Sequence, residues 1–276
     1  MWSLFFSKPF PGTTHKKKLF TVKSRLFCSV HPPVDNLSGI FPVRKPRDYT
    51  SFDVVKKIRS IILQQWSTEN YGKRPKWIKV GHGGTLDPFA TGVLVIAIGS
   101  ACSQLGSFLQ CSKIYKATLK FGEETDTMDN TGKVVETKPV PNISMQEIQS
   151  ILLSGYQGVV EQVPPAYSAI HVRGKRAYEW ARKGVSVELP KRKVRIHHIE
   201  CCSCCMPIAE FCIECSGGTY IRRLLSDIAK DCHTVGHLIA LERIQQGPFH
   251  LQDAVSLDDL KQISQIQHTI ERFAVQ

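Results

Sequence analysis

The residues with the clearest capacity for chemistry lie in the segment 81–92, GHGGTLDPFATG, which places the carboxylate Asp87 among four glycines. Glycines permit positive φ angles and close backbone approach, and Pro88 stiffens the chain directly after the acid. A carboxylate held in a fixed, exposed pose is available for nucleophilic chemistry, although the same residues could form a structural turn. Neither the G-x-G-x-x-G spacing of dinucleotide sites nor the G-K-[ST] ending of phosphate loops is present, so no nucleotide cofactor is expected.

The cysteines could in principle bind a metal. The segment 201–205, CCSCC, is followed by Cys212 and Cys215, and four thiolates with zinc-like internal spacing can be drawn from this set. However, only seven residues separate Cys204 from Cys212, which is short for a zinc ribbon, and residues 211–215 alternate in polarity as a half-buried strand does. We therefore expect reduced structural thiols and no metal, and keep a zinc-containing interaction module as an alternative.

The elements that must position Asp87 can be predicted from periodicity and capping. A continuous apolar run, Val93–Ile98, follows the segment and predicts a buried strand. Further strands are expected at Leu37–Val43 and Lys113–Phe121, and a polar connection at Ser67–Lys79. Thr50 and Ser51 are expected to cap a helix that has one apolar face, formed by Val54, Val55, Ile58, Ile61 and Ile62. The capping box of Ser144 and Glu147 opens a second helix, which is expected to bury Met145, Ile148, Ile151 and Leu152; further helices are expected at Thr219–Asp231 and after Leu257. Strands and helices do not alternate regularly, which predicts an α+β fold with a mixed, mainly antiparallel sheet and flanking helices.

Charge favours a polyanionic partner. The formal net charge is +12, and half of it comes from six cations that precede the first acidic residue, Asp35. A basic excess favours nucleic acid, although a merely basic, soluble surface fits the charge as well. Residues 1–34 contain no carboxylate and resemble an organelle-targeting leader or a disordered basic arm; we expect an intracellular protein, with a mitochondrial location favoured over a nuclear or cytosolic one. No apolar stretch is long enough to cross a bilayer.

Five motifs, in order, resemble those of TruB-type pseudouridine synthases. The segment 81–94 matches that family's G-H-x-G-T-L-D-P-x-A-T-G-V-L pattern at every fixed position. The others are Gly39–Ser51 with Lys45 and Pro46; Lys113-x-Tyr115 followed by 122–132, GEETDTMDNTG; 162–184, which holds QVPPAYSA and GKRAYEWARKG; and 215–222, CSGGTYIR. The resemblance covers nearly all of residues 37–252 and implies the pseudouridine synthase fold, with a catalytic cleft, and an RNA-modifying isomerase that needs no cofactor.

The resemblance also implies roles for individual residues. Asp87 would be the nucleophile and Arg222 its ion-pair partner, while Tyr115 would stack on the target base and is a candidate for removing the C5 proton. His82, Tyr220 and Leu241 would line the pocket of the flipped uridine, and Lys45 belongs to the first motif on the substrate side. The cations expected to contact RNA phosphates are Lys175, Arg176, Arg182, Lys183, Lys191, Arg192 and Lys193.

The family's domain plan sets the remaining expectations. We expect a leader at 1–34, a TruB-type catalytic domain at 35–255 and a short helical tail at 256–276 without the PUA-like RNA-binding domain of bacterial relatives. The implied substrate is the uridine of the tRNA T-arm stem-loop (position 55), with folded messenger RNA as a further substrate, and the implied state is a monomer. Asp48 stands where the first motif usually has glycine, and His171 where lysine is common. An RNA-folding protein without turnover is the alternative from another class.

Overall fold

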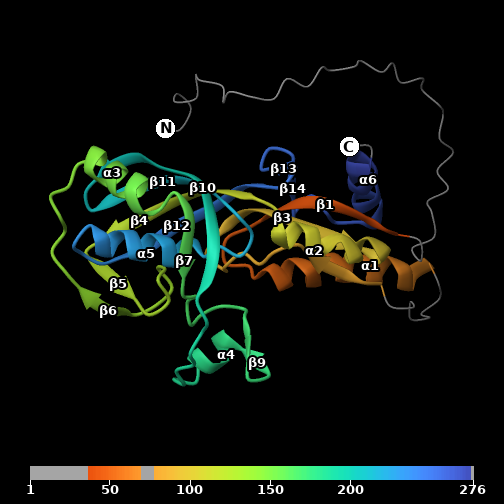
Figure 1. The fold of residues 1–276 in the computed structure, drawn as a ribbon. Helices are drawn as coiled ribbons and strands as arrows, with labels where there is room; N and C mark the ends of the chain where they lie inside the picture. Colours follow the sequence, from red (N-terminus) through yellow and green to blue (C-terminus); the bar gives the residue numbers. More distant parts are fainter. Residues whose placement is uncertain (1–36, 70–77, 275–276) are drawn as a thin grey trace, which may run out of the picture. The chain divides into compact units, whose positions relative to one another are not determined.

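A ten-stranded sheet runs through the part of the chain that the computed structural model describes, residues 37–69 and 78–274 (Figure 1). Its strands follow the order β14 (Val255–Ser256), β1 (Gly39–Lys45), β3 (Thr91–Ile98), β12 (Gly236–Gln246), β4 (Lys113–Phe121), β11 (Ile208–Cys215), β10 (Arg192–Cys205) and β7 (Gly158–Gln162), with β2 (Val80–His82) on β3 and β13 (Phe249–His250) on β12. Only β1 with β14 and β12 with β3 pair in parallel. The predicted mixed, mainly antiparallel sheet is therefore confirmed.

Two hydrophobic cores lie along this sheet. One contains β4, β10, β11 and β12 with α3 (Met145–Gly155) and α5 (Ile221–Asp231). The other contains β1 and β3 with α1 (Ser51–Glu69) and α6 (Ile263–Ala274). The short helix α2 (Leu105–Gln110) follows the 3₁₀ segment at Gly99–Gln104. The two cores meet where β3 pairs with β12, so that a loop crossing this junction can pack its side chains into both cores.

Smaller elements extend from the sheet. The hairpin of β5 (Glu123–Thr125) and β6 (Val134–Thr137) follows β4, and the hairpin of β8 (His171–Val172) and β9 (Lys175–Arg176) precedes α4 (Ala177–Ala181). Figure 1 shows α4 and β9 away from the sheet, in the connection between β7 and β10. Lys175 and Arg182, which are expected from the sequence to contact RNA phosphates, both lie in this connection.

The predicted helix starts are confirmed in part. Ser144 and Glu147 form the reciprocal capping box of α3, which buries Ile148 and Leu152. The expectation that Met145 is buried was wrong, because this first residue of the helix precedes the turns that face the sheet and its side chain is 42% exposed. Thr50 caps α1 by accepting a hydrogen bond from the Asp53 amide, 3.0 Å.

Other boundaries also shift. The helix α1 continues to Glu69, so the start of the polar connection predicted at Ser67–Lys79 is helical, and residues 70–77 lie outside the described part. The helix α6 packs with β1 and α1 through Ile263, Ile266 and Ile270. The segment expected to be a tail is thus part of the second core, because its apolar stripe covers a sheet face that would otherwise be exposed.

The cysteine-rich segment forms the paired strands β10 and β11. Cys201 and Cys215 face the core, whereas Cys202 and Cys205 are exposed. Cys201 and Cys205 would share a face in a regular strand, but a β-bulge between Cys201 and Ser203 shifts the alternation of β10. Burial raises the pKa of the Cys201 thiol to about 12, so this group stays protonated at neutral pH. Within residues 37–69 and 78–274, no three His, Cys, Asp or Glu side chains are grouped as metal ligands.

Among the helices of these same residues, none combines the length and the apolar character that crossing a bilayer requires. The leader expected at residues 1–34 lies outside the described part of the chain.

Candidate active site

The loop between β2 and β3 carries Asp87 across the junction of the two cores. Val80 and Val93, on the flanking strands, belong to the core that holds α1, whereas Leu86, Phe89 and Ala90 insert into the core that holds α5. Both ends of the loop are therefore fixed by one core, and its middle is fixed by the other. Asp87 lies between these anchors, and its side chain keeps 28% of its surface exposed.

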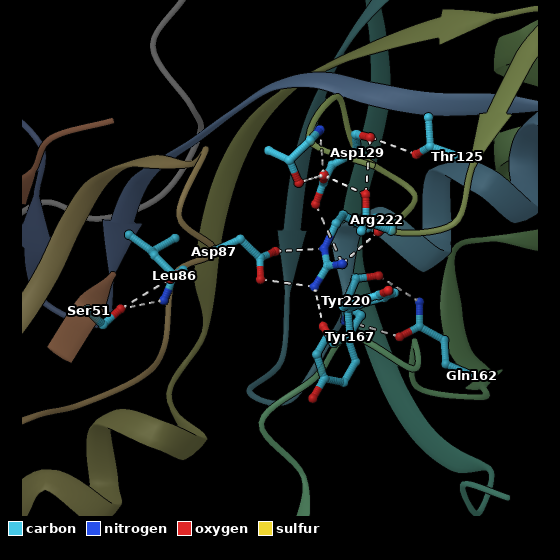
Figure 2. A network of polar contacts seen from close by, with 11 residues as sticks. Ser51, Leu86, Asp87, Thr125, Asp129, Gln162, Tyr167, Tyr220 and Arg222 are labelled. Carbon is cyan, nitrogen blue, oxygen red and sulfur yellow. Dashed lines mark hydrogen bonds and ion pairs between the residues drawn. The ribbon is translucent and has the colours of Figure 1, made fainter. Parts of the chain in front are cut away.

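Polar contacts from α1 add to this anchoring. Ser51, expected to share in capping the helix, instead turns its hydroxyl to the loop, where it donates to the Leu86 carbonyl at 3.2 Å and accepts from the Leu86 amide at 2.9 Å (Figure 2). These two bonds fix the backbone of the residue directly before Asp87.

Lys45 and Asp48 hold the backbone that directly follows Asp87. Lys45, predicted to bind substrate, is fully buried, and its ammonium donates to the carbonyls of Pro46 (2.8 Å), Tyr49 (2.5 Å) and Pro88 (3.1 Å). The Asp48 amide also donates to the Pro88 carbonyl, 2.9 Å. Asp48 has φ 65°, so it adopts the left-handed conformation for which a glycine is suited at this motif position, and the turn persists. Lys45 therefore positions the loop.

Arg222 and Asp87 form the ion pair that the sequence predicts. The Nε of Arg222 donates to Oδ2 at 2.7 Å, and Nη2 donates to Oδ1 at 2.9 Å, which is a bidentate pair (Figure 2). The arginine side chain is only 3% exposed. One carboxylate is thus oriented through both oxygens while part of its surface faces the solvent.

The rest of the Arg222 guanidinium is also held. Nη1 donates to the Thr127 carbonyl at 2.7 Å and lies 3.6 Å from Oδ2 of Asp129, and Nη2 donates to the Tyr167 carbonyl at 2.9 Å. Asp129 is 6% exposed and accepts the hydroxyl and amide of Thr131. Two carboxylates therefore face one buried guanidinium. Asp129 stands in the motif 122–132, yet its role was missed, because spacing along a loop does not reveal which groups converge in space.

Tyr115 is buried in β4, 6% exposed, and pairs in register with Arg243 of β12. Burial raises the pKa of its phenol above the usual range, and the positive charge of Arg243 acts against this rise. Asp87 is close enough to contribute electrostatically to the same phenol. No hydrogen bond or ion pair of the described residues joins Tyr115 to Asp87 or Arg222, so its catalytic role stays a prediction.

The three residues assigned to the base pocket come from separate elements. His82, in β2, accepts a long hydrogen bond at Nδ1 from the Gly84 amide, 3.4 Å, and burial followed by the charge of Arg243 lowers its pKa, which favours neutral imidazole. Tyr220 caps the N-terminal end of α5, where Gln162 bonds its amide at 3.1 Å and its carbonyl at 3.3 Å. Leu241 is buried in the same core as Tyr115. These placements leave the predicted pocket roles as predictions.

Lys175 and Arg182 are exposed on the connection between β7 and β10. The Lys175 ammonium lies 5.1 Å from the ring centroid of Trp180, and the Arg182 guanidinium lies 5.2 Å from that of Tyr178. Backbone bonds tie this connection to the segment that contacts Arg222, since the Tyr178 amide donates to the Ser168 carbonyl at 3.1 Å. No described contact brings either cation to Asp87.

Similarity to known sequences agrees with this geometry. The family model described as "TruB family pseudouridylate synthase (N terminal domain)" matches residues 72–221. The chain belongs to the TruB family. It is 40% identical to the tRNA pseudouridine synthase B of Clostridium kluyveri over 81% of this chain and 72% of that protein. It is also 39% identical to the mouse pseudouridylate synthase TRUB1 over 86% of this chain and 71% of that protein.

A solved relative supports the fold. The TruB-family chain resembles a chain in the crystal structure of a Cbf5–Nop10–Gar1 complex with a TM-score of 0.59 and 24% identity. The match covers 81% of this chain and 53% of that one, so this chain spans about half the length of the solved protein. The predicted pseudouridine synthase fold is confirmed.

Replacing the buried lysine tests its role in this TruB site. We expect Lys45→Met to lower the free energy of unfolding by about 2 to 3 kcal/mol, because three carbonyls lose their donor. We also expect kcat to fall on the order of tenfold, because the backbone next to Asp87 is no longer held. Urea unfolding and single-turnover rates measure the two effects. Lys138→Met is the control, because Lys138 is an exposed lysine that pairs with Glu136. Equal stability and equal rates of the two variants would contradict the positioning role of Lys45.

Proposed function

We propose that this protein isomerises uridine in RNA to pseudouridine, with the T-arm stem-loop of tRNA as its substrate. The observation that carries the proposal is the bidentate pairing of Arg222 with a partly exposed Asp87. The membership of the TruB family supports the reaction, and the relatives named tRNA pseudouridine synthase B support tRNA as the substrate.

The isomerisation of uridine requires few groups besides Asp87 and Arg222. The bond from ribose C1′ to uracil N1 breaks and a bond from C1′ to C5 forms, while C5 loses its proton to a base and N1 gains a proton. Oxidation state is unchanged and no energy donor is needed, so one carboxylate that holds a covalent intermediate is sufficient, whether it attacks C1′ or C6. In the proposed mechanism Asp87 is this nucleophile, and Tyr115 accepts the C5 proton in its phenolate form, which the charge of Arg243 favours against the effect of burial.

The target uridine must leave its stack to reach the carboxylate. Enzymes that act on a base extrude it into a pocket lined by apolar and aromatic side chains. Leu241 and Tyr115 belong to the core that contains α5, the helix of Arg222, and the partly buried Tyr220 stands at the start of that helix. We propose that these residues contact the flipped uracil and that His82, kept neutral by its surroundings, hydrogen-bonds the same nucleotide.

Loss of tritium from C5 tests the proposal directly. A T-arm hairpin with [5-³H]uridine at the target position is incubated with the recombinant chain, with EDTA and without nucleotide. We expect release of the label to water, and pseudouridine in the digested product. A hairpin that binds but keeps its label would contradict the enzyme and favour an RNA-folding protein without turnover. Folded messenger RNA hairpins of the same loop sequence test the further substrate class.

The proposed phosphate contacts predict the salt dependence of binding. Each of Lys175→Gln and Arg182→Gln is expected to weaken hairpin binding and to reduce the slope of log K against log salt by about 1. Fluorescence anisotropy across a range of salt concentrations measures the slope. Lys138→Gln is the matched control, because it removes a similarly exposed cation directly after β6. If neither Lys175→Gln nor Arg182→Gln changed the slope, the proposed phosphate contacts of these two residues would be ruled out.

Two further proposals concern the state of the protein in the cell. We propose that the chain acts as a monomer, which sedimentation of the recombinant protein tests; a stable dimer would contradict it. We also propose a mitochondrial location from the acid-free composition of residues 1–34. A fluorescent reporter fused to these residues should accumulate in mitochondria, and a nuclear or cytosolic signal would contradict the proposal.

A further inference from the structure

Arg243 is a buried cation that the proposed reaction does not use. It lies in β12 with 1% of its surface exposed, although charged residues are rarely so buried. On one side its backbone pairs with Gly92 of β3, and on the other it pairs with Tyr115 of β4. The residue therefore lies between the end of the Asp87 loop and the strand that carries the tyrosine.

The guanidinium bonds both ends of that loop. Its Nε donates to the Val93 carbonyl at 2.7 Å, and its Nη2 donates to the Gly84 carbonyl at 3.0 Å. Close approach depends on glycine, because a Cβ at Gly92 would overlap the backbone of Arg243 and one at Gly84 would contact Nη1. A planar guanidinium presents several donors in a fixed arrangement that meets these two carbonyls, and a lysine at this position would lack that arrangement.

Arg243 also lies beside Tyr115 in the sheet, where the two residues pair in register. Its charge counteracts the rise that burial causes in the phenol pKa. Within the described residues, the hydrogen bonds of this guanidinium go to two loop carbonyls, and no carboxylate forms an ion pair with it. A buried charge is tolerated only when polar groups compensate it, so the cation and the loop stabilise each other in one arrangement.

We propose that Arg243 is a positioning residue of the active site, which holds both ends of the Asp87 loop against the strand that carries Tyr115. The role rests on the proposed function, since Asp87 and Tyr115 are the groups that it aligns. Gln246, on the same strand, supports it by donating to the Gly83 carbonyl at 2.7 Å. Arg243 acts through these groups and not on the RNA.

Kinetics of Arg243→Lys test the proposal. We expect kcat for the T-arm hairpin to fall on the order of 100-fold with KM changed by less than about threefold, because misplacement of reacting groups affects the chemical step and not RNA binding. We expect guanidinium chloride at millimolar concentration to restore part of the kcat of Arg243→Ala. Arg223→Lys is the matched control, because Arg223 is a partly buried arginine of α5 whose guanidinium pairs with Asp227 through two contacts of 2.9 Å, outside the loop.

Hydrogen exchange supplies a readout that does not need turnover. In Arg243→Lys the amides of residues 83–90 should exchange at least about tenfold faster, whereas Arg223→Lys should leave them unchanged. An unchanged kcat, a loss confined to KM, or a loss of kcat without guanidinium rescue and without faster loop exchange would overturn the proposal. If the wild-type chain releases no label from the hairpin, the proposed function fails, and loop exchange still decides whether Arg243 holds the loop.

Discussion

Asp87→Asn is expected to reduce pseudouridine formation by at least about 10⁴-fold, because the amide cannot form the covalent intermediate. The substitution preserves the shape of the side chain, and Arg222 keeps its bonds to the Thr127 and Tyr167 carbonyls. The fold should therefore persist, with a loss of about 1 to 2 kcal/mol in the free energy of unfolding from the weakened pair. Hairpin affinity should stay within about threefold of the wild type.

Single-turnover tritium release, with enzyme in excess over the labelled hairpin, measures this effect without interference from product release. Asp126→Asn is the matched control, because Asp126 is an exposed acid of a neighbouring loop whose Oδ1 accepts the Lys133 amide at 2.8 Å. Release by Asp87→Asn at a rate close to that of Asp126→Asn would remove the nucleophile assignment and leave the ion pair as a structural feature.

Much of the fold follows from local sequence, since periodicity and capping report on the chain around each residue. The alternation along β4 and the capping box of α3 were sufficient to place those elements. Contacts between segments far apart in the chain cannot be predicted from local sequence in this way. The apolar stripe of α6 predicts a helix, but not that it covers β1, because that contact joins residues more than 200 positions apart.

The same distinction applies to the site. The motif and the family resemblance identified Asp87 and Arg222, which the structure brings together. Lys45 and Ser51 were given other roles, since only the folded chain turns them toward the backbone of the Asp87 loop. Arg243 did leave a signal in the sequence: it is a charged residue in the buried phase of a strand, two positions after Leu241, and such a departure from alternation marks a cation with specific partners.

Loss of the arginine partner should separate stability from catalysis. In Arg222→Met, two carboxylates face each other without a cation, and we expect the free energy of unfolding to fall by about 3 kcal/mol, the lower part of the range for breaking a buried pair, since Asp87 is partly exposed. We expect single-turnover release to fall on the order of 10³-fold, because the carboxylate is no longer oriented through both oxygens. Arg222→Lys keeps the charge but not the bidentate geometry, and should recover stability more than rate.

Addition of Asp129→Asn to Arg222→Met then discriminates between the two contributions. Removing the buried Asp129 charge relieves the repulsion between the carboxylates, so the double variant should unfold at a higher urea concentration than Arg222→Met alone. Its turnover should stay as low as that of Arg222→Met, because Asp87 still lacks its orienting partner. Recovery of both properties together would mean that Arg222 serves only to neutralise buried charge, and that the orientation of Asp87 comes from the loop contacts of Ser51, Lys45 and Arg243.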